Sequence, residues 1–124
     1  MPDAGFDMLS FEGKKVYLSC GATDMRKSID GLTNIVQISF TLDPFAPAAY
    51  VFCNRKRDRI KILVWDEDGF WLLFKRLEKG HFRWPKEGEE LTMTLTQEEL
   101  GTLLDGAKVE LKLKRNEVFE RSTY

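Results

Sequence analysis

Alternation of apolar and polar positions is clearest between residues 59 and 77. Residues 59–65 and 70–77 are rich in β-branched and aromatic side chains, and both runs alternate in character. The residues that join them, 66–69, read Asp-Glu-Asp-Gly, and acidic residues followed by glycine are typical of a tight turn. The pattern therefore predicts a β-hairpin over residues 59–77.

The predicted hairpin has two faces of different chemistry. Placing Trp65 opposite Phe70 puts alternate side chains of both strands on the same face. One face is then basic and aromatic, with Arg59, Lys61, Leu63, Trp65, Phe70, Leu72, Phe74 and Arg76. The other is almost entirely apolar, with Ile60, Ile62, Val64, Trp71 and Leu73, and Lys75 near its end. We expect this apolar face, Trp71 included, to belong to the core and to be covered by the first helix.

Other stretches of the chain predict two helices and further strands. Apolar residues at helical spacing indicate an amphipathic helix over about residues 24–38, with Thr23 as its N-cap. Thr96 and Glu99 form a capping box before a short second helix that stops at Gly106. Strands are predicted at 14–20, 49–53 and 91–95, and residues 109–114 are predicted as a final strand or as a continuation into a partner.

These elements predict an α+β fold. We expect a mostly antiparallel sheet of about four to six strands, one main amphipathic helix packed on it, and a short C-terminal helix. A chain of 124 residues fits one domain. The prediction is a single domain over residues 1–124, with its core at about 14–106 and loose tails at 1–12 and 115–124.

Charge is distributed unevenly along the chain. The formal net charge of −1 by itself argues against a nucleic-acid partner. Residues 51–85, however, carry nine basic and five acidic side chains, whereas the segments before and after them are net acidic. The middle third is therefore a local positive field in which an anionic partner can settle.

Targeting signals and a disulfide framework are not evident in the sequence. No run of about 18 apolar residues occurs, and the N-terminus lacks the basic start and apolar stretch of a signal peptide. Cys20 and Cys53 are too few for a disulfide scaffold or a zinc site. We therefore expect reduced, buried thiols in a cytoplasmic protein.

The basic face of the hairpin, with the turn before it, is the candidate binding surface. Cations follow phosphates, and aromatic rings offer stacking planes for bases. We expect phosphate contacts from Arg55, Lys56, Arg57, Arg59, Lys61 and Arg76, and stacking or partner contacts from Trp65, Phe70 and Phe74. Arg59 and Arg76 lie opposite each other, so an anion or a carboxylate from Asp58 or Glu78 is needed between them. The same pattern also fits a solvated sheet face without a partner.

Catalytic and metal-binding chemistry has little support in the sequence. His81 is the single histidine, and a lone loop histidine is more often structural than a general base. Asp66 and Asp68 suit the geometry of a turn, and their spacing does not match a calcium-binding loop. No nucleophile motif or phosphate-binding glycine loop is present. We therefore expect no enzyme activity, no bound metal and no cofactor.

Several separated blocks of the sequence together point to a family. They are Val16-Tyr17-Leu18, Gly21-x-Thr23-Asp24-Met25-Arg26-Lys27-Ser28-Ile29-Asp30-Gly31-Leu32, Asp43-Pro44-Phe45, Val51-Phe52-x-Asn54-Arg55-Lys56-Arg57-Asp58-Arg59-Ile60-Lys61, Trp65-Asp66-x-Asp68-Gly69-Phe70, Lys75-Arg76-Leu77-Glu78-x-Gly80 and Phe82-x-Trp84-Pro85, with a weaker block at Leu103-Leu104-x-Gly106. In this order, over about residues 14–85, the chain resembles the TnpB-type accessory proteins of insertion-sequence 66 transposons. These are unrelated to the RNA-guided nucleases that share the TnpB label. The resemblance implies a protein that assists a separate, larger transposase of the same element, and it supplies no catalytic residues.

Three functions follow from these observations. The first is a non-catalytic accessory of insertion-sequence transposition that binds transposon DNA, the transposase of the same element, or both, through the hairpin. The second is a pure protein-interaction module, in which the aromatic side chains are a hot spot and the arginines its rim. The third is a metal-dependent nuclease that uses Asp24, Asp58, Asp66 or Asp68. No small-molecule substrate and no membrane contact are expected.

Overall fold

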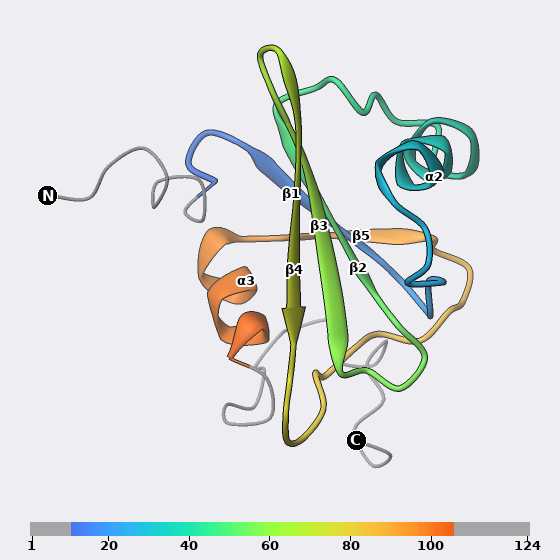
Figure 1. The fold of residues 1–124 in the computed structure, drawn as a ribbon, viewed down its shortest axis with the longest axis vertical. Helices are drawn as coiled ribbons and strands as arrows, with labels where there is room; N and C mark the ends of the chain where they lie inside the picture. Colours follow the sequence, from blue (N-terminus) through green and yellow to red (C-terminus); the bar gives the residue numbers. More distant parts are fainter. Residues whose placement is uncertain (1–10, 106–124) are drawn as a thin grey trace, which may run out of the picture.

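A five-stranded sheet organises residues 11–105, the part of the chain that the computed structural model describes (Figure 1). The elements are β1 (Lys15–Ser19), α2 (Ile29–Asn34), the π-helix η1 (Ile35–Ser39), β2 (Ala48–Cys53), β3 (Arg59–Asp66), β4 (Gly69–Arg76), β5 (Thr92–Leu95) and α3 (Gln97–Leu104). The strand order is β4-β3-β2-β1-β5. Of the strand pairs in the described part of the chain, only β1 with β2 is parallel, so the predicted α+β fold with a mostly antiparallel sheet is confirmed. No helix within residues 11–105 has the length and apolar character to cross a membrane.

The hairpin of β3 and β4 has the predicted register. Trp65 lies opposite Phe70, and Arg59 lies opposite Arg76 at the other end of the pair. Because side chains alternate along both strands, the predicted basic and aromatic residues share one face of the sheet. The position of the hairpin and the pairing of its strands, both predicted from the sequence, are therefore confirmed.

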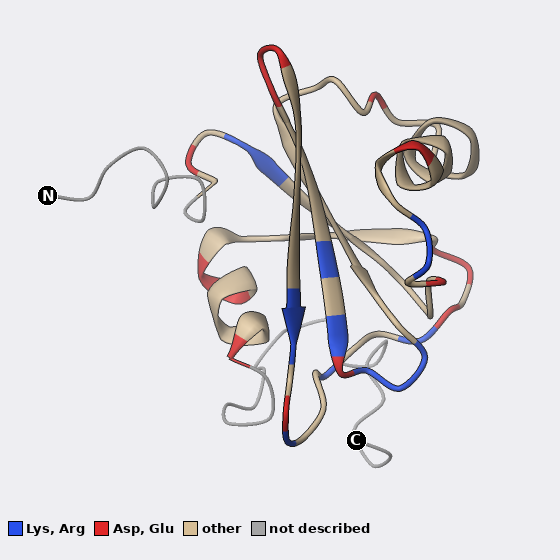
Figure 2. Ribbon diagram, viewed as in Figure 1, with Lys and Arg blue, Asp and Glu red and all other residues tan. Residues whose placement is uncertain are grey.

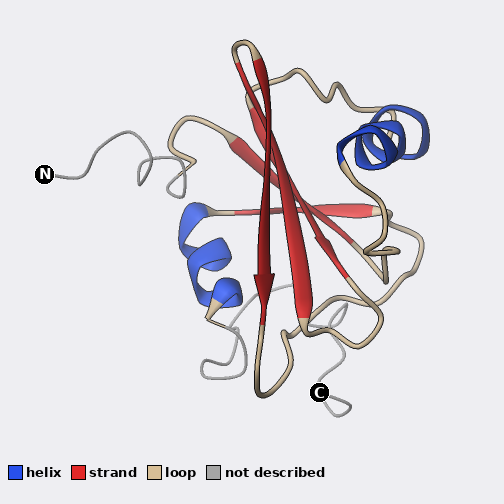
Figure 3. Ribbon diagram, in the orientation of Figure 1, coloured by secondary structure: helices blue, strands red, loops and turns tan. Residues whose placement is uncertain are grey.

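The two helices lie on opposite sides of the sheet (Figure 3). α3 packs through Leu100 and Leu103 on the apolar face of the hairpin, together with the buried rings of Phe82 and Trp84. α2 and η1 pack on the other face, which carries Leu63. The prediction that the first helix covers the apolar face of the hairpin is therefore wrong.

The physical reason for this error lies in β2. Every residue of β2 is buried, on both faces of the sheet. Alternation in the hairpin defines which side chains share a face, but a strand buried on both sides gives no sign of which helix covers which face. Tyr50 and Phe52 of β2 instead form a second core with Leu32 and Val36 of the first helix.

Trp71 lies at the surface rather than in the core, which corrects a second prediction. Its side chain is 46% exposed, and its indole Nε1–H donates to Asp66 Oδ2 at 2.9 Å. β4 is an edge strand, so among the described residues no further strand lies beside Trp71. The buried tryptophan is Trp84, whose Nε1–H donates to the carbonyl of Ser19 at 2.8 Å.

The first helix begins at Ile29 rather than near residue 24. The carboxylate of Asp24 instead closes a turn by accepting a hydrogen bond from the amide of Arg26 at 2.9 Å. The amide of Thr23 donates to the carbonyl of Cys53 at 2.7 Å. This bond holds the segment against the end of β2, so Thr23 does not act as the helix cap that its residue type suggested.

The capping box before α3 is confirmed. Thr96 Oγ1 accepts from the Glu99 amide at 3.0 Å, and the Glu99 carboxylate accepts from the Thr96 amide at 2.9 Å. The predicted stop at Gly106, the strand at 109–114 and the tail at 115–124 lie outside the described residues. Of the predicted N-terminal tail, Phe11 is described, and its side chain is buried in the core.

Both cysteines are free thiols, with Cys53 buried and Cys20 half-buried. Burial raises the pKa of the Cys53 thiol to about 12. Burial and, second, the charge of Glu90 raise the pKa of the Cys20 thiol to about 11. Both groups therefore stay neutral near pH 7 rather than acting as nucleophiles. Cys53 is a core side chain as predicted, whereas Cys20 is only half-buried, which corrects the prediction that both thiols are buried.

Trp84 and Trp71 allow a matched test of this packing. Both indoles donate one hydrogen bond, but only that of Trp84 is buried. We expect Trp84→Phe to lower the free energy of unfolding by about 1–3 kcal/mol, because the Ser19 carbonyl loses a buried donor. Trp71→Phe should change it by less than about 0.5 kcal/mol, as surface changes usually do. Urea unfolding measures both, and equal losses would contradict the assignment of Trp84 to the core.

Candidate nucleic-acid interface

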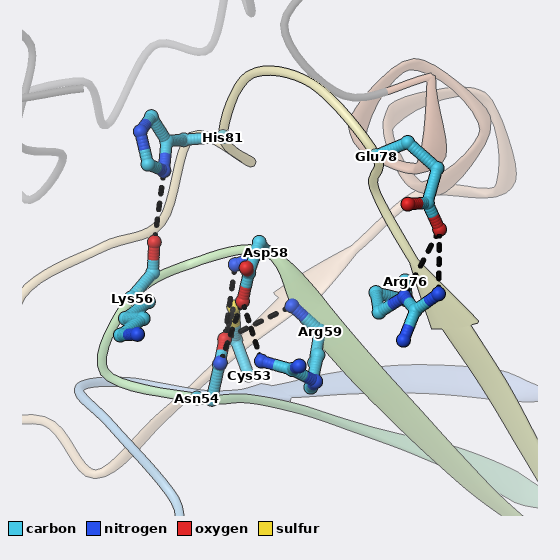
Figure 4. Close-up of polar contacts among 8 residues, drawn as sticks. All are labelled: Cys53, Asn54, Lys56, Asp58, Arg59, Arg76, Glu78 and His81. Carbon is cyan, nitrogen blue, oxygen red and sulfur yellow. Dashed lines mark hydrogen bonds and ion pairs between the residues drawn. The ribbon is translucent and has the colours of Figure 1, made fainter.

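Residues 54–58, here called the basic turn, connect β2 to β3 and are held by the side chain of Asn54 (Figure 4). Asn54 Oδ1 accepts from the amides of Asp58 at 3.0 Å and Arg59 at 2.9 Å. Asn54 Nδ2 donates to the Asp58 carboxylate at 2.7 Å, and the Arg57 amide donates to the Asn54 carbonyl at 3.1 Å. One side chain therefore fixes both ends of a turn whose middle residues are all cations.

A second segment, residues 77–82, binds the basic turn from the other side. The amides of Leu77 and Phe82 donate to the carbonyls of Asp58 at 2.8 Å and Arg57 at 2.7 Å. His81 Nδ1 lies 2.9 Å from the carbonyl of Lys56, and the carbonyl makes the ring nitrogen the donor. The single histidine thus supports the backbone of the turn, in agreement with its structural interpretation.

The cations of the basic turn differ in exposure. Arg55 and Lys56 are exposed, and among the described residues neither side chain forms an ion pair with a carboxylate. Arg57 is half-buried, has a φ of 63°, and its guanidinium donates to the Arg55 carbonyl at 3.4 Å. Positive φ is uncommon for a side chain of this size, so the surrounding hydrogen bonds must hold Arg57 in place.

Arg59 and Arg76, opposite each other in the hairpin, each have a carboxylate partner. Arg59 pairs with Asp58 at 3.3 Å, and Arg76 pairs with Glu78 at 3.0 Å (Figure 4). The sequence predicted that a carboxylate from Asp58 or Glu78 offsets the repulsion between the two arginines; in the structure, each arginine has one of these carboxylates as its partner. The hydrogen bond from Asn54 and, less strongly, the charge of Arg59 lower the pKa of Asp58, so this carboxylate stays ionised near pH 7.

Lys61 joins the hairpin to the segment before the first helix. Its ammonium group donates to the carbonyls of Met25 and Lys27, both at 2.8 Å, and its side chain is half-buried. Lys61 therefore has a structural task besides the phosphate contact that the sequence suggested for it. Its charge still adds to the positive potential at this end of the sheet.

Shallow hollows surround the basic turn. One, of about 430 Å³, has Arg55, Lys56 and Arg59 on one side and Thr23, Asp24 and Met25 on the other. A neighbouring hollow is lined by Arg59, Lys61 and Phe74, among others. In the first hollow the Asp24 carboxylate is held by Arg26 at 2.8 Å, and hydrogen bonds from Arg26 lower its pKa to about 2. Its charge is therefore offset locally by a guanidinium.

The predicted aromatic surface is divided into two parts. Trp65 and Phe70 have ring centroids 4.9 Å apart, and both contact Phe45, at 4.9 and 5.5 Å. Phe74 is 55% exposed and lies instead at the hollow beside Arg59. Phe45 was not among the sequence candidates, since a loop residue between two prolines has no periodicity to connect it with the hairpin.

Basic residues outnumber acidic ones at one end of the hairpin, where Asp58 and Glu78 also lie, and the tip at the other end is acidic (Figure 2). The basic turn, Arg59, Arg76 and Lys79 gather at one end, and Asp66, Glu67 and Asp68 form the tip at the other. An anionic partner is therefore attracted to the end that contains the basic turn.

The four carboxylates considered for a metal site do not form one cluster: Asp66 and Asp68 share the tip of the hairpin, whereas Asp58 lies in the basic turn at its other end. Asp24 pairs with Arg26, Asp58 with Asn54 and Arg59, and Asp66 accepts from Trp71. Within residues 11–105, no group of three or more His, Cys, Asp or Glu side chains is placed to hold a metal ion.

Comparison with known proteins identifies the family. The family described as IS66 Orf2-like protein matches residues 14–114, which extends beyond the blocks at 14–85 that carried the resemblance. Two uncharacterized proteins of Sinorhizobium fredii (strain NBRC 101917 / NGR234) are similar. The protein y4hO is 34% identical over 98 residues, 78% of this chain and 84% of its own, and y4jC is 29% identical over 96 residues, 76% and 80%. No solved structure matches the chain significantly. The chain belongs to the IS66 Orf2-like family of transposition-associated accessory proteins.

Proposed function

We propose that this accessory protein binds the DNA backbone through the basic turn. The observation that carries the proposal is the state of Arg55 and Lys56: both are exposed, and among residues 11–105 neither is neutralised by a carboxylate. Phosphates are the anions that such cations meet along DNA, and backbone contacts supply most of the non-specific affinity.

The rigidity of the basic turn supports the same function. Because Asn54 and residues 77–82 hold its backbone, the cations are presented without ordering a loop on binding. Binding then costs less conformational entropy than it would for a flexible basic segment.

Arg59 and Arg76 extend the basic surface along the hairpin. Their ion pairs with Asp58 and Glu78 are partly exposed, and exposed ion pairs are weak in water. A phosphate can therefore exchange with the carboxylate at little cost. Phe74, exposed beside Arg59 and Lys61, offers a stacking surface where a base is unpaired.

A protein-interaction role is the second candidate, and the aromatic cluster favours it. Phe45 is 53% exposed over the rings of Trp65 and Phe70. Large aromatic side chains dominate binding hot spots, and the neighbouring acidic tip suits a cationic partner. The transposase of the same element is the partner we propose for this surface, which lies at the opposite end of the hairpin from the basic turn.

The DNA proposal predicts a change in salt dependence. Affinity for duplex DNA should fall steeply as salt rises, and Arg55→Ala/Lys56→Ala should reduce the slope of log affinity against log salt by about two, one for each lost phosphate contact. Lys14→Ala/Lys15→Ala, which removes the same charge at the start of β1, should leave the slope nearly unchanged. Gel shifts at several salt concentrations measure this. Binding that is absent, or insensitive to salt, would contradict the DNA proposal.

Asn54→Ala tests the part played by the ordered turn, because it leaves every charge in place. We expect DNA affinity to fall about tenfold, as the cations lose their fixed positions, and unfolding free energy to fall by about 1–3 kcal/mol. Asn34→Ala, at an exposed helical position, is the matched control and should leave affinity unchanged. Affinity is to be measured at a temperature where circular dichroism shows both variants folded. Unchanged affinity in folded Asn54→Ala would show that order in the turn does not matter.

A further inference from the structure

β4 is a long strand at the edge of the sheet formed by residues 11–105. It is the last strand in the order β4-β3-β2-β1-β5, contains eight residues, and among the described residues pairs only with β3. Its other side therefore presents backbone amides and carbonyls that are available to another strand. The opposite edge, β5, has four residues.

The centre of β4 lacks the features that usually protect an edge strand. Residues 70–74 read Phe-Trp-Leu-Leu-Phe, with no charge and no proline. Trp71 is 46% exposed and Phe74 is 55% exposed, and their positions in the strand place them on opposite faces of the sheet. Natural proteins cover, shorten or charge such edges to prevent uncontrolled pairing. A partner strand would remove backbone and aromatic surface from water on both faces.

The charges at the two ends of β4 indicate which strand can pair with it. Asp66, Glu67 and Asp68 precede the strand, and Lys75 and Arg76 end it; all five are exposed. Arg76 pairs with Glu78 at 3.0 Å, but this pair is exposed, so a carboxylate of a second copy can exchange with Glu78. A second β4 that runs antiparallel brings each acidic tip beside the basic end of the other copy. A second β4 that runs parallel would place like charges together, which is unfavourable. The strand is therefore electrostatically complementary to its own antiparallel copy.

We propose that the protein forms a twofold dimer in which β4 of each copy pairs antiparallel with β4 of the other. A pairing centred on Leu72 places Asp68 opposite Arg76 of the second copy and Phe70 opposite Phe74 of the second copy. The result is a continuous sheet through both molecules. Such an interface uses the same surface of both copies, so it closes the edge instead of extending into a fibre.

Each part of this interface has a separate energetic role. Main-chain hydrogen bonds and burial of Trp71 and Phe74 supply the affinity. The charged ends lie at the rim, where they select the antiparallel direction more than they add affinity. The dimer does not rest on DNA binding, because Arg55 and Lys56 lie outside β4 and the salt-slope test concerns those two residues. Pairing of the strands covers Phe74, so stacking of a base on that ring is open only to the monomer.

A charge swap tests the dimer and its direction together. The wild-type chain should show a concentration-dependent dimer in analytical ultracentrifugation. Glu67→Lys/Asp68→Lys makes both ends of the hairpin basic, and Arg76→Glu/Lys79→Glu makes both ends acidic. Each variant alone should dissociate about tenfold more readily or worse, because like charges then meet across the interface. An equimolar mixture should form a heterodimer at least as tight as the wild-type dimer. These substitutions leave Asp66, the partner of Trp71, in place.

Hydrogen exchange of the β4 amides provides the second readout. The outward-facing amides of β4 should exchange more slowly as protein concentration rises, whereas those of β5 should not change. A wild-type chain that is monomeric at all concentrations overturns the proposal. A monomer with slow exchange along β4 also overturns it, since the edge would then be covered within one chain. Variants that dimerise as tightly as the wild type exclude the antiparallel arrangement, because the swap changes the charges that meet only in that arrangement. Variants that dissociate but fail to pair when mixed show that charge does not select the partner strand, which also contradicts the proposal.

Discussion

The amide of Asn54 is the interaction on which the candidate interface depends. It binds the backbone at the far end of the basic turn and the Asp58 carboxylate at the same time. Without it, consecutive cations between two strands would repel one another and spread through solvent. With it, Arg55 and Lys56 have fixed positions, and Asp58 is oriented toward Arg59. A single neutral side chain thus converts a basic stretch of sequence into a surface with defined geometry.

Local pattern was enough to predict the hairpin, its register and the capping box of α3, because each depends on neighbours along the chain or across one tight turn. Local pattern was not enough for features that depend on contacts between segments far apart in the sequence. Which helix covers which face depends on the path of the chain around β2, which is buried on both sides. The helix start at Ile29 reflects the bond between Thr23 and Cys53, which no local signal encodes.

The candidate site was predictable to a similar extent. The cations were identified from their charge alone, and their carboxylate partners were anticipated for Arg59 and Arg76. The attachment of Lys61 to the carbonyls of Met25 and Lys27 was not, because it links positions far apart in sequence. The contact of Phe45 with Trp65 was not predicted either, because these residues too are far apart in sequence.

The uneven distribution of charge along the hairpin also explains how a chain of net charge −1 offers both a basic and an acidic surface.

Amide chemical shifts during titration with a short DNA duplex test the central claim most directly. The account predicts that the largest changes fall on residues 54–59, with smaller ones on 22–26 and 74–76, and that the changes fade as salt rises. The hairpin tip at 66–68 and α3 should remain unaffected. Changes that fall mainly on the tip, on α3 or on β5, or an absence of changes at low salt, would contradict the assignment of the basic turn as the DNA contact.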